Sequence, residues 1–331
     1  MRPFKYTRVT ETGAAAAALE ANPQAKFLAG GTNLLDLMKE DVERPTELVD
    51  LSRLRLTEIK RAAGGGVSIG ALATNTDTAN HPLIRRNYPL LSQAIVAGAS
   101  GQLRNMATNG GNLLQRTRCQ YFYDTAMPCN KREPGTGCGA REGLNRVHAI
   151  LGWSEKCVAT YPGDMANALL ALDAVVRVRG AGGRERTIRM DEFHRLPGDA
   201  PERDTNLEHG ELIEAVELPA SNFAKNSYYL KVRDRASYAF ALVAVAAALE
   251  LNRGTIRQAR VVLGSVAHKP WRSRDAEAAL SGKPVSEEVF RQAAEAALKD
   301  AKPLAHNGYK VELGKRAVVR ALMRASKPGG A

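Results

Sequence analysis

The sequence predicts an α+β protein of two domains. The chain has 331 residues, which is near the upper limit for a single hydrophobic core. Helical and strand-like segments are mixed along it, and no internal repeat is present. Pro219 and the polar stretch 221–227 interrupt this pattern. We therefore expect a first domain over residues 1–222 and a second over residues 223–331.

Hydrophobic periodicity places the elements of the first domain. A period of 3.6 residues indicates a helix, and alternation indicates a strand. Helices are expected over residues 14–21, from Thr32 or Asn33 onward, and over 83–97 and 165–172. Strands are expected over residues 26–29, 47–51, 66–71, 174–179 and 212–218. A glycine-rich turn at 108–112 and an irregular segment at 119–157 separate them.

The second domain contains two strand-like segments followed by two alanine-rich helical segments. The strands are expected over residues 228–232 and 259–266, and the helices over 287–299 and 315–325. Residues 239–249 are ambiguous, because alanine favours a helix while valine and phenylalanine permit a strand.

Composition excludes several classes of protein. Hydrophobic residues make up 44% and charged residues 25%, as in ordinary globular chains. The longest apolar run, 239–249, is much shorter than the ~20 residues of a bilayer span. The net charge is +12, but aromatic residues are only 5% and do not interleave with the basic patches. This argues against a nucleic-acid groove and favours an anionic cofactor or an acidic partner. The N-terminus has no apolar signal core, so we expect a cytoplasmic protein unless a partner carries it out folded.

Two glycine pairs are candidates for phosphate binding. Residues 27–34 read as a strand that enters Gly30 and Gly31 before a helix start, where free N–H groups and the helix dipole favour an anion. Residues 108–112 form a second pair flanked by threonine and asparagine. Tight turns with no ligand are the alternative for each. Neither motif has the spacing of a dinucleotide fingerprint or a Walker loop.

All four cysteines fall within one 39-residue stretch: Cys119, Cys129, Cys138 and Cys157. Four thiolates can ligate an iron–sulfur cluster or a structural zinc, and two disulfides are a further alternative. The absence of a C-x2-C pair disfavours a zinc ribbon. The surrounding segment is rich in proline, glycine and charge, so a bound metal would explain how it folds. We interpret the six histidines as surface or core residues, and only His148 could act as a replacement ligand.

The motifs together resemble the FAD-binding subunits of the xanthine dehydrogenase family of molybdenum hydroxylases. The resemblance rests on five segments that occur in family order over nearly the whole chain: residues 29–34, 104–112, 163–174, 211–219 and 231–239. It implies an α+β fold in which an FAD-binding PCMH-type domain of two subdomains precedes a smaller C-terminal domain. That second domain is expected to be CO-dehydrogenase-flavoprotein-like, with a three-stranded sheet and helices.

Within this family the chain is most similar to the subunits of bacterial periplasmic aldehyde oxidoreductases. Residues 101–105, 112–119, 121–124 and 267–272 carry this likeness. An insertion at about 117–160 holds all four cysteines, and in the similar proteins it binds a [4Fe-4S] cluster. The resemblance therefore implies Cys119, Cys129, Cys138 and Cys157 as cluster ligands. We expect the cluster to brace the insertion rather than conduct electrons, because relatives without it still reduce FAD.

The resemblance also assigns the FAD-binding residues. The pyrophosphate is expected at backbone N–H groups and small polar side chains of both glycine motifs, Lys26, Phe27, Leu28, Ala29, Gly30, Gly31, Thr32, Asn33, Leu34, Thr108, Gly110, Gly111 and Asn112. Asp164 is expected to bind the ribitol or ribose side, and Gly98 and Ile213 to pack against the cofactor. Lys231 is expected near the flavin ring, where its charge would favour the anionic reduced form.

The implied activity is electron relay in a heterotrimer. A molybdenum-cofactor subunit would oxidise an aldehyde, and a ferredoxin-like subunit with [2Fe-2S] clusters would deliver the electrons to this FAD. NAD-using relatives have acidic residues shortly after the position of Lys231, where this chain has Ala236-Ser237-Tyr238, so we expect another external acceptor. The alternatives are the FAD subunit of a 4-hydroxybenzoyl-CoA reductase-like enzyme, a self-contained flavin oxidase, and a basic zinc-containing nucleic-acid-binding module. A periplasmic location would require co-export with a signal-bearing partner.

Overall fold

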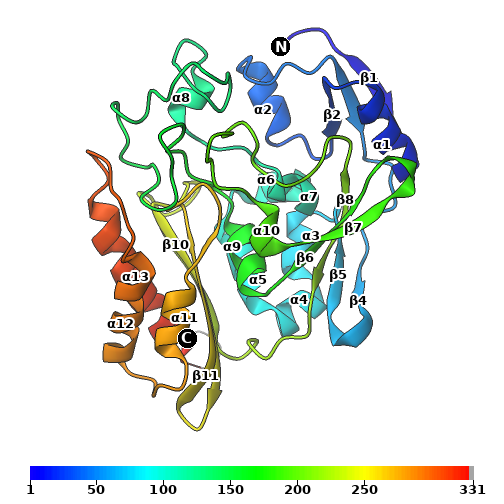
Figure 1. Ribbon diagram of the computed structural model, residues 1–331. Coiled ribbons are helices and arrows are strands. Elements are labelled where there is room, and N and C mark those ends of the chain that lie inside the picture. Colours follow the sequence, from blue (N-terminus) through cyan, green and yellow to red (C-terminus); the bar gives the residue numbers. More distant parts are fainter. Residues whose placement is uncertain (328–331) are drawn as a thin grey trace.

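The computed structural model describes residues 1–327, which form three β-sheets with helices between and around them (Figure 1). The first sheet is parallel, in the order β1-β3-β2, and helix α1 joins its two outer strands. The loop 29–33 leaves the carboxyl end of β2 and enters α2, which is the edge where α/β sheets bind ligands. The elements are β1 (Lys5–Arg8), α1 (Thr12–Ala21), β2 (Ala25–Leu28), α2 (Leu34–Lys39) and β3 (Glu47–Asp50).

The second sheet has five antiparallel strands in the order β4-β5-β8-β6-β7. Helices α3, α4, α5 and α9 cover one of its faces, and their apolar side chains form the largest core of the protein (Figure 1). The strands are β4 (Ile59–Arg61), β5 (Val67–Gly70), β6 (Val175–Arg179), β7 (Glu185–Arg189) and β8 (Leu212–Leu218). The helices of this part are α3 (Asn75–Asn80), α4 (Pro82–Asn87), α5 (Pro89–Ala97), α6 (Gly101–Met106), α7 (Asn109–Leu113), α9 (Asp164–Ala171) and α10 (Met190–Phe193).

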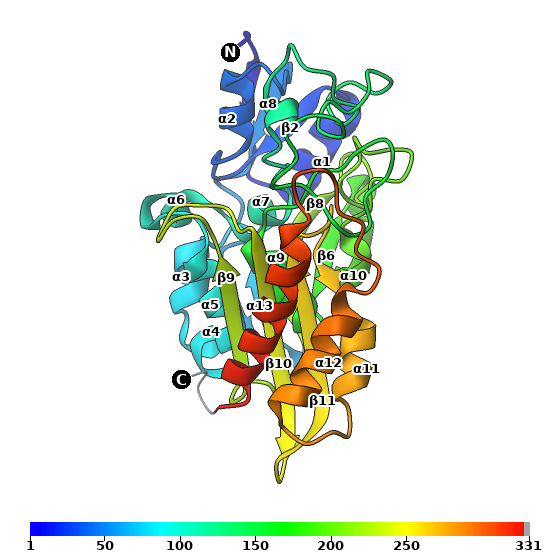
Figure 2. The same cartoon turned by 90° about the vertical axis from the view of Figure 1, so that its left-hand side faces the viewer.

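The third sheet belongs to the C-terminal part of the chain. The three antiparallel strands expected there are extended by a two-residue edge strand, β12. Helices α11, α12 and α13 cover its outer face (Figure 2), while α5 and α9 pack on the inner one. The elements are β9 (Ser227–Val232), β10 (Val243–Asn252), β11 (Thr255–Gly264), β12 (Trp271–Arg272), α11 (Arg274–Leu280), α12 (Glu287–Leu298) and α13 (Tyr309–Ala325). No helix within residues 1–327 is long and apolar enough to cross a membrane.

Residues 243–249 of the ambiguous segment form part of strand β10, not a helix. The strand is buried on both faces over these residues. Ala244, Ala246 and Ala248 face the core under the five-stranded sheet, while Val243, Val245 and Leu249 face the core under α11–α13. A strand buried on both sides has a continuous apolar sequence with no alternation, so periodicity cannot separate it from a helix.

Two expected elements differ in the structure. The single helix expected over 83–97 is two helices, α4 and α5, because Pro89 cannot continue α4 and instead starts α5. The glycine-rich turn expected at 108–112 is the N-terminal cap and first turn of the short helix α7. The hydroxyl of Thr108 accepts a hydrogen bond from the backbone N–H of Gly111 at 3.3 Å.

The segment 119–157 is irregular, as expected, apart from the one-turn helix α8 (Gln120–Tyr123). A small apolar cluster around Phe122 and Ala140 lies inside it, and polar side chains organise much of its backbone. The side-chain oxygen of Asn130 accepts the N–H groups of Gly135 and Gly137 at 3.1 and 2.8 Å. Arg132 donates to the carbonyl groups of Tyr121 and Phe122 at 2.8 and 2.9 Å. Figure 1 shows much of this segment as an open set of loops beside α2, while Ile150 and Leu151 belong to the core under α11–α13.

Candidate cofactor site

Two cavities meet where the glycine motifs approach each other. The larger, about 640 Å³, lies between α5, α6, α9 and β9, and the smaller, about 380 Å³, lies behind the 29–33 loop. Thr32, Asn33 and Gly111 line both cavities, so these residues form the junction. Every residue expected to bind FAD lines one cavity or the other. An elongated ligand with an anionic middle and two ring systems would fit this arrangement.

The first glycine motif provides the free donors of the junction. Among the described residues, the backbone N–H groups of Gly31, Thr32 and Asn33 have no acceptor within the chain. The Asn33 side chain is oriented by the backbone N–H of Arg116, which donates to its oxygen at 2.8 Å. Its buried amide nitrogen, Nδ2, is left with no partner. Buried donors are rarely left unpaired, so these groups fit a pyrophosphate.

Most backbone donors of the second motif are already engaged within the chain. The backbone N–H groups of Gly110 and Asn112 donate to the carbonyl groups of Ala71 and Thr108, each at 2.8 Å. Among the described residues, the backbone N–H of Thr108 has no acceptor within the chain. The absence of a side chain at Gly110 keeps α7 close to Ala71, because an added Cβ would lie 3.2 Å from the Ala71 methyl group.

The floor of the larger cavity is a buried ion pair. Lys231 on β9 donates to the carboxylate of Asp164 at 2.7 Å and to the carbonyl of Ala97 at 3.1 Å. The two charged side chains are only 5% and 9% exposed. A lysine ammonium has three donors, so one remains available to a ligand in the cavity. Gly98 leaves room for this carboxylate, because an added Cβ would lie 3.2 Å from it.

Tyr229 is a residue of this site that sequence reasoning missed. Its hydroxyl donates to the second oxygen of Asp164 at 2.7 Å and accepts from Asn167 at 3.1 Å. Burial raises the pKa of Tyr229 well above its ordinary value, and the Asp164 charge acts in the same direction. The hydroxyl therefore keeps its proton and fixes the carboxylate. Tyr229 lies two residues before Lys231, on the same face of β9, and reads as a core residue in the sequence.

Aromatic and cationic side chains surround the mouth of the larger cavity. Tyr238 and Phe240 are 56% and 54% exposed, although both line the cavity. The guanidinium of Arg118 lies over the Phe240 ring, 5.2 Å from its centre. Tyr238 has a backbone φ of +49°. Such a positive φ is uncommon for a residue other than glycine. These exposed rings form a platform at the opening of the cavity.

The four cysteines also come together. Cys119, Cys129, Cys138 and Cys157 all line one small cavity of about 10 Å³ inside the insertion. They are free thiols, and none forms a disulfide. Within residues 1–327, no three histidine, cysteine or carboxylate side chains converge closely enough to hold a single metal ion. In a cubane cluster each thiolate binds a different iron, which suits four cysteines around a common space better than around one point.

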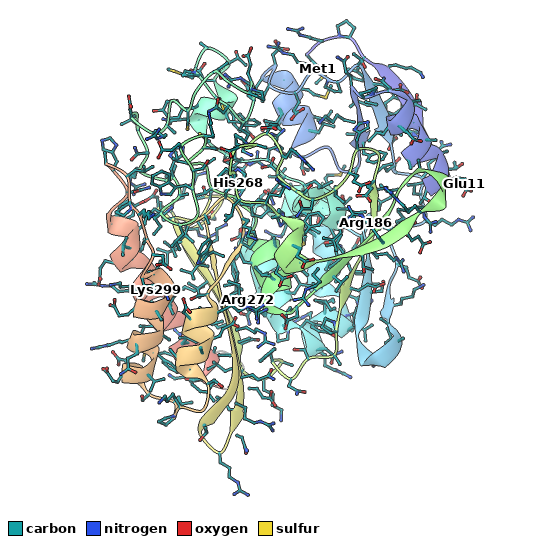
Figure 3. All side chains as sticks on the ribbon, viewed as in Figure 1. Met1, Glu11, Arg186, His268, Arg272 and Lys299 are labelled. Carbon is teal, nitrogen blue, oxygen red and sulfur yellow. The ribbon has the colours of Figure 1, made fainter. Side chains whose placement is uncertain are left out.

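The cysteine cavity is anchored to the rest of the protein by buried charge. The ammonium of Lys131, which is 1% exposed, donates to the Pro201 carbonyl at 2.6 Å and to the carboxylate of Asp204. Burial alone would raise the pKa of Asp204, but Lys131 and Arg116 outweigh it and lower the pKa to about 2. His268, near the middle of the molecule in Figure 3, lies 3.8 Å from the same carboxylate. Asp204 thus stays ionised and ties the insertion to the body of the chain.

Burial controls the chemistry of the cysteines. It raises the pKa of the Cys119 and Cys157 thiols to about 12. A neutral thiol is a poor nucleophile, so these are not reactive cysteines. A bound cation would reverse the effect, because ligation deprotonates a thiol.

Comparison with known proteins identifies the family. The family described as the FAD binding domain in molybdopterin dehydrogenase matches residues 2–221, and the CO dehydrogenase flavoprotein C-terminal domain matches residues 228–325. The chain is 50% identical over 327 residues to the aldehyde oxidoreductase FAD-binding subunit PaoB of Escherichia coli, covering 98% of this chain and 99% of that protein. The chain belongs to the family of FAD-binding molybdenum hydroxylase subunits.

More distant members of the family share the same fold. The medium chain of glyceraldehyde dehydrogenase from Sulfolobus acidocaldarius is 26% identical, over 88% of this chain and 85% of that one. The crystal structure of carbon monoxide dehydrogenase from Hydrogenophaga pseudoflava is 26% identical, with a TM-score of 0.77 and 98% of each chain covered. The α+β fold, the FAD-binding domain and the CO-dehydrogenase-flavoprotein-like domain that follows it are therefore confirmed. The chain is an oxidoreductase subunit of this family.

Substituting Gly30 tests the first glycine motif. A Cβ at this position would lie 1.9 Å from the Met106 carbonyl oxygen, so Gly30→Ala must displace the loop that carries the free donors. Overpacking of this kind costs about 1–3 kcal/mol. We expect FAD retained per chain after gel filtration to fall by roughly tenfold. Gly13→Ala on α1 is the matched control, since its Cβ would meet nothing within 4 Å. Unchanged FAD content in Gly30→Ala would contradict the assignment.

Substituting Lys231 tests the floor of the larger cavity. Lys231→Ala removes the cation that would stabilise an anionic reduced flavin, while the glycine motifs remain intact. In the fraction that retains FAD, we expect flavin reduction to slow by roughly tenfold, which corresponds to about 1.4 kcal/mol in a barrier. Stopped-flow reduction and the flavin midpoint potential are the measurements. Lys225→Ala, at an exposed lysine, is the control. A wild-type rate and potential in Lys231→Ala would rule out its role.

Proposed function

We propose that this protein is the FAD- and [4Fe-4S]-containing electron-transfer subunit of a heterotrimeric molybdenum-dependent aldehyde oxidoreductase. The observation that carries the proposal is the junction of the two cavities, where free backbone donors and the unpaired Asn33 amide await an anion. The 50% identity to a subunit named for aldehyde oxidation supports the choice of substrate class. A bound flavin would supply the one- and two-electron chemistry that side chains lack.

The chain's own residues would bind and orient the cofactor. The 29–33 loop would hold the pyrophosphate, with the adenosine half in the smaller cavity and the flavin half in the larger. Lys231 would place its remaining N–H and its charge toward the flavin, held in position by Asp164 and Tyr229. Asp164 keeps lone pairs free to accept ribitol hydroxyl groups even with both oxygens engaged.

The four cysteines support the second cofactor. They come from positions spread over 39 residues, yet all face one cavity in a segment with almost no regular secondary structure. Iron bound by all four cysteines would cross-link these loops, which bury few apolar side chains of their own. One ligand, Cys119, also lines the larger cavity, so the centre would border the flavin as well as brace the insertion.

The implied partners are a ferredoxin-like subunit with [2Fe-2S] clusters and a subunit with the molybdenum cofactor. The mouth of the larger cavity would admit the external electron acceptor. The residues 236–238 read Ala-Ser-Tyr, which favours an acceptor other than NAD, although Asp234 places one carboxylate on the cavity lining.

The function is tested on the complex of the three subunits. We expect each purified heterotrimer to contain one FAD. We also expect four iron atoms from the cluster on this chain, in addition to the iron of the partner's [2Fe-2S] clusters. Anaerobic addition of an aromatic or aliphatic aldehyde should bleach the flavin absorbance, and NAD should not restore it. A complex whose flavin stays oxidised with every aldehyde tried would overturn the proposed activity.

Substituting Cys129 tests the cluster. Cys129→Ser should lower the iron and acid-labile sulfide of this subunit to near background and reduce the yield of folded protein, because ligation is coupled to folding. FAD content of the material that does fold should be affected less. Thr125→Ala, at an exposed position of the same insertion, is the control. Full iron and sulfide content with normal yield in Cys129→Ser would refute the ligand assignment.

A further inference from the structure

His148 lies between the larger cavity and the small cavity lined by the four cysteines. Its ring nitrogen Nε2 is 3.1 Å from the sulfur of Cys119. Both residues are buried, with 2% and 8% of their surface exposed. Both line the larger cavity, and Cys119 also lines the cavity shared by the four cysteines. The pair is therefore the point at which the two cavities adjoin.

The position of His148 is fixed from outside the insertion. Its carbonyl oxygen accepts hydrogen bonds from Lys310 on α13 at 2.9 Å and from Asn307 at 3.2 Å. Its backbone N–H donates to the carbonyl of Asn145 at 3.1 Å. These bonds hold the backbone from which the ring reaches the Cys119 sulfur.

The chemistry of a thiolate ligand determines the role of this ring. A thiolate bound to iron has lone pairs and no proton, so a nitrogen at hydrogen-bond distance must carry the proton. Hydrogen bonds to ligating sulfur stabilise the more negative, reduced state of a cluster and raise its reduction potential. The ring meets this requirement when Nε2 carries a proton, as in the Nε2-protonated neutral tautomer and in the doubly protonated ring.

We propose that His148 is a positioning residue for the iron–sulfur centre, whose Nε2–H donates to Cys119 and raises the reduction potential of the centre on its flavin-facing side. The proposal rests on the cluster assigned above under the proposed function. Cys129, Cys138 and Cys157 have no histidine partner in residues 1–327, so the effect enters at one ligand. The proposal also gives a function to His148, which the sequence analysis interprets only as a core residue or a replacement ligand.

Redox titration of the holo-complex, followed by electron paramagnetic resonance, tests the proposal. His148→Phe keeps a planar ring but removes the N–H donor. The reduced-to-oxidised ratio of the cluster at the wild-type midpoint should fall roughly tenfold, which is about 59 mV for one electron. His148→Gln, which returns an N–H at similar reach, should recover most of the shift. His306→Phe, at an exposed histidine, should leave the potential unchanged. An unaltered potential in His148→Phe with full iron content would overturn the inference.

A measurement on the unmodified complex covers the case in which His148→Phe does not fold. Pulsed electron paramagnetic resonance of the reduced centre, with ¹⁵N-labelled histidine, should detect one weakly coupled histidine nitrogen and one proton that exchanges in D₂O. Absence of both couplings would overturn the role of His148 while leaving the cluster in place. Absence of cluster iron and sulfide in the unmodified complex would instead refute the cofactor itself, so the two failures are distinguishable.

Discussion

The ion pair between Lys231 and Asp164 is the interaction on which the flavin side of this protein depends. Removing two charges from water is costly, and the cost is offset only when their remaining protons and lone pairs form hydrogen bonds. Here the Ala97 carbonyl and the Tyr229 hydroxyl do this, so α5, α9 and β9 must pack together for the pair to form. Asp164 and Lys231 also come from the two separately matched family domains. A cavity for one cofactor is thus built on a contact between both.

The sequence predicts those parts of the site that depend on local chemistry. Glycine pairs next to a helix start, and cysteines clustered in a polar segment, are visible without any tertiary information. Tyr229 and His148 are not, because their roles come from neighbours 65 and 29 residues away. Strand β10 is ambiguous for a related reason: burial on both faces erases the alternation that marks a strand. The break at Pro89 was readable in principle, since proline cannot continue a helix, but the apolar pattern runs through it.

The insertion is stabilised in a different way from the rest of the chain. The two large cores bury aliphatic side chains, whereas the insertion relies on Asn130, Arg132 and the Lys131–Asp204 pair to satisfy its backbone and fix its position. Hydrogen bonds of this kind define a shape but contribute little net stability. This explains why the segment places four thiols around one space, and why its integrity is tied to whatever those thiols bind.

The double burial of β10 also determines how the molecule can move. The alanine face of this strand belongs to one core and its valine and leucine face to the other, so the strand is a wall common to both. Hinge rotation of one half against the other would expose both cores to water, and no such opening is compatible with interior packing. The part of the larger cavity formed by α5, α9 and β9 is built on one of these cores, so its walls keep a constant separation. Electron tunnelling falls steeply with distance, so a frame that does not bend would suit the electron-transfer role proposed above.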